Sequence, residues 1–109
     1  MPDHPHLTDL EQLLMLSVLR LPDGAHGAAI QADLEEHAAR GVSLGSIHMT
    51  LGRLEERGLV RSRKGAPQGV RGGKARRLYT VKPEGRAVLE WAREVLEQMW
   101  DGVPSEGGG

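Results

Sequence analysis

The sequence contains no cysteine and no phenylalanine, and it has only one tyrosine and two tryptophans among 109 residues. Without cysteine, disulfides, thiolate metal sites and cysteine nucleophiles are excluded, and a reducing cytoplasm is the expected location. Without phenylalanine, the core must be built from Leu, Val, Ile, Ala and Met. A domain of this size buries only about 60–65% of its unfolded surface, so association with a second chain would add stability.

Long apolar runs are also missing. No stretch approaches the roughly 18 residues of a membrane-spanning helix, and the N-terminal MPDHPHLTDLEQ lacks the basic start and apolar centre of a signal peptide. Helix capping explains Ser43 and Ser46, and no phosphate-binding loop precedes a helix, so we expect no enzyme and no cofactor. His4 and His6 offer only two ligands on a loose tail, and we expect no metal site.

Acidic residues are absent between Glu56 and Glu84, where nine basic residues occur, although the whole chain has a formal charge of −1. The segment 61–77, RSRKGAPQGVRGGKARR, holds seven of these basic residues and four glycines. A charge run by itself is usually a solvated face, so its meaning depends on the elements around it.

Capping and turn signals divide the chain. Thr8 and Glu11 have the spacing of a capping box, Ser43 is a favoured N-cap, and Pro83 suits a first helical position. The segment between the two strands is glycine-rich and basic, as expected of a hairpin loop. The expected elements are helices over about 9–21, 25–39, 44–58 and 83–100, and strands over 59–64 and 76–81.

Apolar residues surround nearly the whole first helix and half of the last one, which is more than one small domain needs to cover. The sequence therefore predicts a homodimer. The expected interface residues are Leu10, Leu14, Val88, Trp91, Val95 and Met99. The expected organisation is a flexible tail over 1–7, a domain of three helices and a hairpin over 8–82, a dimerisation helix over 83–101 and a flexible tail over 102–109.

Three helices followed by a strand, a basic loop and a second strand describe a winged helix-turn-helix, a mainly α fold of the α+β class. The third helix would enter a major groove of double-stranded DNA, and the hairpin would follow the phosphate backbone. The expected base contacts are Ser46, Met49, Thr50 and Arg53. The expected backbone contacts are His48, Arg63, Lys64, Arg71, Lys74, Arg76 and Arg77.

Four segments, LEQLLMLSVLRLPDGAHGAAI, VSLGSIHMTLGRLEERGLV, GGKARRLYTV and EGRAVLEWA, together resemble the PadR family of bacterial transcriptional regulators. The resemblance covers about residues 7–100. It implies a homodimeric DNA-binding repressor whose C-terminal helix packs against the partner, and it is closest to the short members with one such helix. It also implies a packing role for Tyr79, which matches the tyrosine of the wing strand.

The chain departs from the family pattern at three positions, with His26 and His48 where tyrosine is usual and Lys82 where threonine often caps the last helix. The two histidines are interpreted either as a pH-sensitive pair or as partly buried replacements for tyrosine, each with one hydrogen bond. Pro83 compensates for the weaker cap.

Two alternatives remain open from the sequence. Met15, Trp91 and Trp100 either line a pocket for a small aromatic effector, which the resemblance keeps open, or are interface core, which is the favoured interpretation. The alternative function is a winged-helix adaptor that mediates protein interaction or dimerisation without binding DNA.

Overall fold

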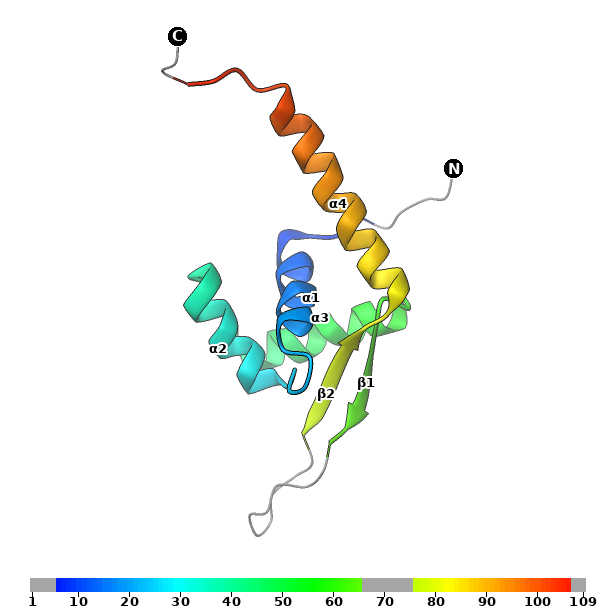
Figure 1. Cartoon of the computed structure of the whole chain (residues 1–109). Helices are drawn as coiled ribbons and strands as arrows, with labels where there is room; N and C mark the ends of the chain where they lie inside the picture. Colours follow the sequence, from blue (N-terminus) through cyan, green and yellow to red (C-terminus); the bar gives the residue numbers. More distant parts are fainter. Residues whose placement is uncertain (1–5, 66–75, 107–109) are drawn as a thin grey trace.

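The computed structural model describes residues 6–65 and 76–106. Within them the chain forms four helices and a two-stranded antiparallel hairpin (Figure 1). In chain order the elements are α1 (Asp9–Arg20), α2 (Gly27–Ala38), α3 (Leu44–Glu56), β1 (Val60–Lys64), β2 (Arg77–Val81) and α4 (Pro83–Asp101). The predicted winged helix-turn-helix fold is confirmed, and the element ends lie within about two residues of those expected from the sequence.

The predicted capping box opens α1. The Glu11 backbone N–H donates to the Thr8 hydroxyl over 3.1 Å, and the Thr8 N–H donates to the Glu11 carboxylate over 2.7 Å. Such a cap stabilises a helix by about 1 kcal/mol. The same carboxylate forms an ion pair with Arg57 at 3.2 Å, so it also ties the start of α1 to the end of α3.

One core lies where α1, α2, α3 and the hairpin meet. Its centre is aliphatic, as the absence of phenylalanine requires. The fully enclosed apolar side chains, each at most 1% exposed, are Leu14, Met15, Ile30, Ile47, Leu51, Leu54 and Val60.

The hairpin is anchored through the middle of β2 and through the residue that follows β2. The Tyr79 N–H donates to the Ala25 carbonyl over 2.9 Å, which attaches the outer edge of β2 to the turn between α1 and α2. The Lys82 N–H donates to the Leu59 carbonyl over 2.9 Å. These bonds fix the hairpin beside α3 and set the point from which α4 departs.

A polar clamp joins α1 to α2. Asp33 accepts hydrogen bonds from the buried Ser17 hydroxyl at 2.8 Å and from the Arg20 side chain at 3.1 Å, and His37 lies 3.0 Å from the same carboxylate. The hydrogen bond from Arg20 holds the pKa of Asp33 below its ordinary value of 3.8. The clamp satisfies the only polar residue that is buried among the described core residues.

Helix α4 begins without a side-chain cap at Lys82 and has Pro83 in its first turn, as expected. Its first turns pack on the domain, and its C-terminal half extends away from it (Figure 1). The radius of gyration is accordingly 16.5 Å, whereas a compact chain of about 100 residues has a value near 13 Å. None of the helices in residues 6–65 and 76–106 combines the length and apolarity needed to cross a membrane.

Candidate nucleic-acid interface

Helix α3 has a buried face and an open face. Ile47, Leu51 and Leu54 are each 0% exposed, and Ser43 caps the helix by accepting the Ser46 N–H over 3.1 Å. These contacts fix the rotation of the helix about its axis. The opposite face is therefore directed outward and is available to a partner.

The four predicted base-contacting residues lie on or beside this open face. Ser46 and Arg53 are exposed, Met49 is 58% exposed, and Thr50 is half-buried. The Arg53 guanidinium donates to the Met49 sulfur at 3.3 Å. Because a thioether is a weak acceptor, this contact is readily exchanged for a stronger one.

Two glycines flank the open face of α3. A Cβ built at Gly45 or at Gly52 would meet nothing within 4 Å. Packing within the fold therefore does not require glycine at either position. Glycine is nevertheless present, even though it costs about 0.5–1 kcal/mol relative to alanine inside a helix. What the glycines do provide is access to the α3 backbone from outside.

The register of the hairpin separates its basic side chains into two faces. Val60 pairs with Val81, Ser62 with Tyr79 and Lys64 with Arg77, and these pairs share the face that packs on the domain. On the outer face Arg61 pairs with Thr80 and Arg63 with Leu78. Lys64 and Arg77 thus continue the α3 side of the molecule, whereas Arg63 points to the other side.

A hydrogen-bonded chain connects the hairpin to α3. Arg77 donates to the Ser62 hydroxyl over 2.8 Å, and that hydroxyl donates to the Glu55 carboxylate over 3.0 Å. Glu55 also accepts the Ser62 backbone N–H over 3.1 Å. The chain holds β1 at a fixed distance from α3. The predicted backbone contacts Arg71 and Lys74 lie outside the described residues.

A cationic depression of about 350 Å³ opens where α2, α3 and β2 converge. It is lined by His26, Gly27, Ala28, Leu44, His48, Arg76 and Arg77. It therefore brings three of the predicted backbone contacts, His48, Arg76 and Arg77, together at the first turn of α2.

His48 joins α3 to the hairpin. Its Nδ1 lies 2.8 Å from the Tyr79 hydroxyl, and its ring lies against Gly27, where a Cβ would fall 2.8 Å from Nε2. Tyr79 is 5% exposed, in agreement with its predicted packing role, and burial raises the pKa of its phenol. The hydrogen bond fits the interpretation of His48 as a replacement for tyrosine, although the residue is exposed and not partly buried as expected.

His26 occupies the N-cap position of α2, which the sequence did not suggest because histidine is not among the favoured N-caps. Its Nδ1 lies 3.4 Å from the Ala29 backbone nitrogen, where it can accept the Ala29 N–H when that ring nitrogen carries no proton, and its Nε2 lies 3.0 Å from a guanidinium nitrogen of Arg76. Burial, followed by the nearby Arg76 charge, lowers the pKa of His26 below its ordinary value. The ring is therefore neutral near neutral pH.

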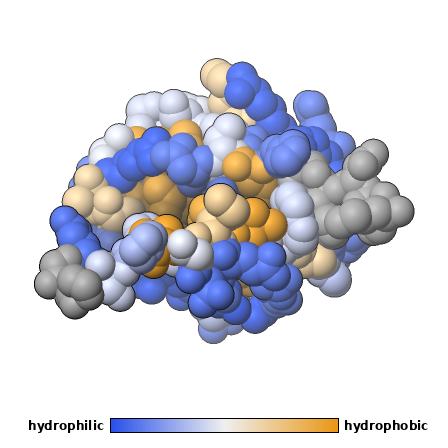
Figure 2. All heavy atoms as spheres, turned by 90° about the horizontal axis from the view of Figure 1, so that it is seen from above, coloured by the Kyte–Doolittle hydropathy of each residue, from blue (hydrophilic) through white to orange (hydrophobic). Residues whose placement is uncertain are grey.

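The exposed apolar residues of α4 lie in its C-terminal half. Val95 is 41% exposed, Leu96 54%, Met99 69% and Trp100 70%. Figure 2 looks down on the side from which α4 projects and shows hydrophobic surface gathered there among hydrophilic residues. Of the predicted interface residues, Val95 and Met99 are thus open to a partner, whereas Leu10 and Trp91 are half-buried.

Three predicted roles need correction. Leu14 and Val88 are 0% and 5% exposed, because both pack into the core of their own chain, so neither side chain has surface to offer in a dimer interface. Met15 is 0% exposed for the same reason and cannot line an interface cavity.

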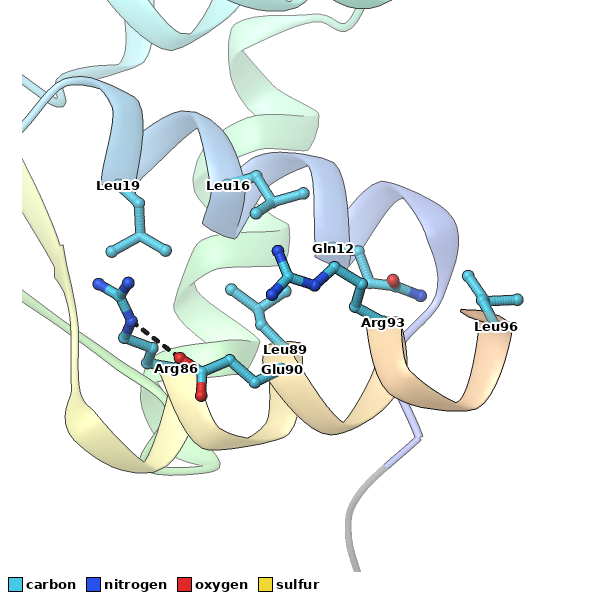
Figure 3. A pocket seen from close by; sticks show the side chains of 8 residues that line it. All are labelled: Gln12, Leu16, Leu19, Arg86, Leu89, Glu90, Arg93 and Leu96. Carbon is cyan, nitrogen blue, oxygen red and sulfur yellow. Dashed lines mark hydrogen bonds and ion pairs between the residues drawn. The ribbon is translucent and has the colours of Figure 1, made fainter. Parts of the chain in front are cut away.

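An apolar groove that the sequence did not predict runs between α1 and α4. It encloses about 330 Å³, and leucines from the two helices face each other across it, with the Arg86–Glu90 ion pair along one side (Figure 3). Its lining residues are Gln12, Leu16, Leu19, Arg86, Leu89, Glu90, Arg93 and Leu96. The groove continues the exposed apolar surface of α4 onto the domain.

Comparison with known proteins agrees with this fold. The model of the transcriptional regulator PadR-like family matches residues 15–91. The transcriptional regulator Rv3488 of Mycobacterium tuberculosis is 43% identical over 74 residues, which are 68% of this chain and 64% of that protein. The chain thus matches slightly less than two thirds of that relative's length.

Solved structures show the same architecture. A PadR family transcriptional regulator from Eggerthella lenta matches with a TM-score of 0.67 at 26% identity, covering 86% of this chain and 81% of its own. A PadR-like transcription factor from Bacteroides fragilis matches with a TM-score of 0.71 at 23% identity, covering 84% of each chain, which is a likeness of fold.

Proposed function

The chain belongs to the PadR-like family of transcriptional regulators, which implies DNA binding rather than enzyme activity, and from that premise we propose that it is a repressor that reads a pseudo-palindromic operator as a homodimer. The observation that carries the proposal is the open face of α3, where exposed Ser46, Met49 and Arg53 stand beside the cationic side of the hairpin. The side chains of both features are exposed and lie outside the core.

Base recognition is assigned to α3. Arg53 is the residue suited to bidentate hydrogen bonding with a guanine edge, and Ser46 and Thr50 suit single contacts. The open space at Gly45 and Gly52 allows the helix backbone to approach the floor of the groove. Met49 offers an apolar contact for a thymine methyl group.

Affinity is assigned to the basic residues beside α3. We expect His48, Lys64, Arg76 and Arg77 to contact phosphates, and we expect the same of Arg71 and Lys74, which lie outside the described residues. Contacts of this kind position the protein and carry no sequence information. Arg63, on the outer face of the hairpin, would take part only if the DNA curves around that face.

Dimerisation is assigned to α4 and to the groove between α1 and α4. A partner helix that presents Val95, Leu96 and Met99 would fill the groove and cover the half of α4 that extends beyond its own domain. Two α3 helices would then meet successive major grooves about 34 Å apart. Repression would follow from occupation of the operator, which excludes other proteins from the same DNA.

A small aromatic effector remains part of the proposal. With Met15 enclosed in the core, the residues available to contact such a ligand are the half-buried Trp91 and the exposed Trp100. Quenching of tryptophan fluorescence by flat aromatic compounds would detect it, and the Trp100→Leu variant would show which ring responds.

Selection of bound sequences from random DNA tests the proposed function. The expected result is a motif with two inverted half-sites whose centres are about one helical turn apart. Recovery of a single half-site would contradict the dimeric arrangement. Failure to enrich any sequence, with normal folding, would instead favour the adaptor without DNA binding.

A further inference from the structure

His26 stands between two hydrogen-bond donors. The Ala29 N–H approaches its Nδ1 to 3.4 Å, and the Arg76 guanidinium approaches its Nε2 to 3.0 Å. Arginine has no acceptor, and a neutral imidazole has one accepting nitrogen and one N–H. Only one of the two neighbours can therefore be satisfied at a time, and the shorter contact belongs to Arg76.

The charged and titratable groups around this ring are all basic. Arg76 and Arg77 reach the depression from the start of β2, and His48 faces it from α3 with its Nδ1 held by the Tyr79 hydroxyl. Of the described residues that line the depression, none is acidic. Gly27 leaves the floor bare, because a side chain there would collide with His48. The depression therefore has the size and charge for an oxyanion.

We propose that this depression binds one phosphate group of the DNA backbone, and that Arg76 moves from His26 to that phosphate when it binds. The inference rests on the proposed function and names one contact within it. Once Arg76 leaves, the proton of His26 relocates from Nδ1 to Nε2. Nε2–H then donates to the phosphate, and Nδ1 becomes the acceptor that caps Ala29.

The exchange gives an acceptor to every donor around His26 that lacks one in the DNA-free protein. Before binding, Arg76 has an acceptor but Nδ1–H faces another donor, so the first turn of α2 lacks its cap. After binding, the guanidinium, Nε2–H and the Ala29 N–H each have an acceptor. The lowered pKa of His26, caused mainly by its burial, supports this order of events because only a neutral ring can cap the helix.

Nitrogen-15 spectra of the histidine rings give the direct test, because they report which ring nitrogen carries the proton. The free protein is expected to show the Nδ1–H form of His26, and saturation with a mixed-sequence duplex at low salt is expected to convert it to the Nε2–H form. Exchange of the Ala29 amide with solvent is expected to slow at the same time. An unchanged tautomer in protein that has bound the duplex would overturn the inference.

A second arm replaces the duplex with inorganic phosphate at matched ionic strength. The expected result is no tautomer change at the phosphate concentration that equals the nucleotide concentration of the duplex arm. Conversion by phosphate alone at that concentration would show a site for a free anion and would overturn the assignment to DNA backbone.

Variants separate the roles of the two residues. His26→Asn keeps an N-cap acceptor and removes the imidazole donor, so we expect DNA affinity to fall about threefold to tenfold with an unchanged salt dependence, because no charge is lost. Arg76→Gln should lower affinity and reduce the salt slope by about 1. The matched control is His37→Asn, because His37 pairs with Asp33 away from the depression. This substitution should leave DNA affinity unchanged.

The two proposals fail differently. If the duplex binds to wild type and to His26→Asn with equal affinity, the phosphate exchange is wrong and the DNA-binding function stands. If no duplex binds to the folded wild-type protein at low salt, both are wrong.

Discussion

Gly85, in the first turn of α4, packs directly against the carbonyl group of Leu59, and no side chain fits between them. The Lys82 N–H donates to the same carbonyl over 2.9 Å. This close approach sets the direction in which α4 leaves the domain. The position of the dimer-forming helix therefore depends on a backbone contact that only glycine permits.

Replacement of Gly85 by alanine should lower the free energy of unfolding by about 2–3 kcal/mol, because the new methyl group meets backbone and the tip of the enclosed Met15. Urea denaturation measures the change. Gly52→Ala is the matched control, since its methyl group meets nothing within 4 Å, and it should raise stability by about 0.5–1 kcal/mol. Equal effects of the two substitutions would contradict the proposed contact.

Arg53→Ala should relax base preference at one operator position and cost about 1–3 kcal/mol there. Lys64→Ala removes a positive charge of the hairpin and should weaken binding to all sequences about equally. Affinities measured on the operator and on single-base variants separate the two effects. A uniform loss across all sequences from Arg53→Ala would show that Arg53 contacts phosphate and not a base.

Val95→Glu should weaken the dimer about tenfold to a thousandfold, because the new charge would be buried in the proposed seam. Gln98→Glu adds the same charge on the exposed polar side of α4 and should leave association unchanged. Sedimentation equilibrium over a range of protein concentrations measures both. A dimer that survives Val95→Glu would place the seam elsewhere on the chain.

Asp33→Ala should cost about 1–3 kcal/mol, because the buried Ser17 hydroxyl loses its acceptor. The pH dependence has a defined sign. Since the pKa of Asp33 is lowered from 3.8, its contribution is complete above pH 3.8 and is lost as the pH falls through the lowered value. Thermal unfolding from pH 2 to pH 7 should thus show a smaller acid loss in the variant.

The Ser17→Ala/Asp33→Ala double variant provides the control for this clamp. With both partners removed, no buried hydroxyl is left unsatisfied, so the double variant should be more stable than Asp33→Ala alone. The opposite order of stability would show that Ser17 has a second acceptor.

Much of the fold follows from local signals in the sequence. Thr8, Ser43 and Pro83 each mark the start of a helix where the structure has one, because capping depends on neighbours only three residues away. The end of α2 was predicted to within one residue, but the residue that stops the helix was not. Gly41 suggested the stop, whereas the left-handed residue that ends the helix is Ala39, with φ of 51°.

Residue roles that depend on distant contacts were harder to predict. A helical wheel shows that Leu14 and Val88 are apolar but not whether their own domain or a second chain covers them. The groove between α1 and α4 needs the crossing of two helices that are about 70 residues apart. His26 as a cap that also contacts Arg76 required the path of β2 past the first turn of α2.

The salt dependence of DNA binding tests the central claim most directly. If each dimer neutralises about five to eight phosphates through the hairpin and the cationic depression, the logarithm of affinity should fall with the logarithm of salt at a slope of roughly −4 to −7. A folded protein that binds no duplex at low salt, or binds with a slope near zero, would contradict the assignment of α3 and the hairpin to DNA.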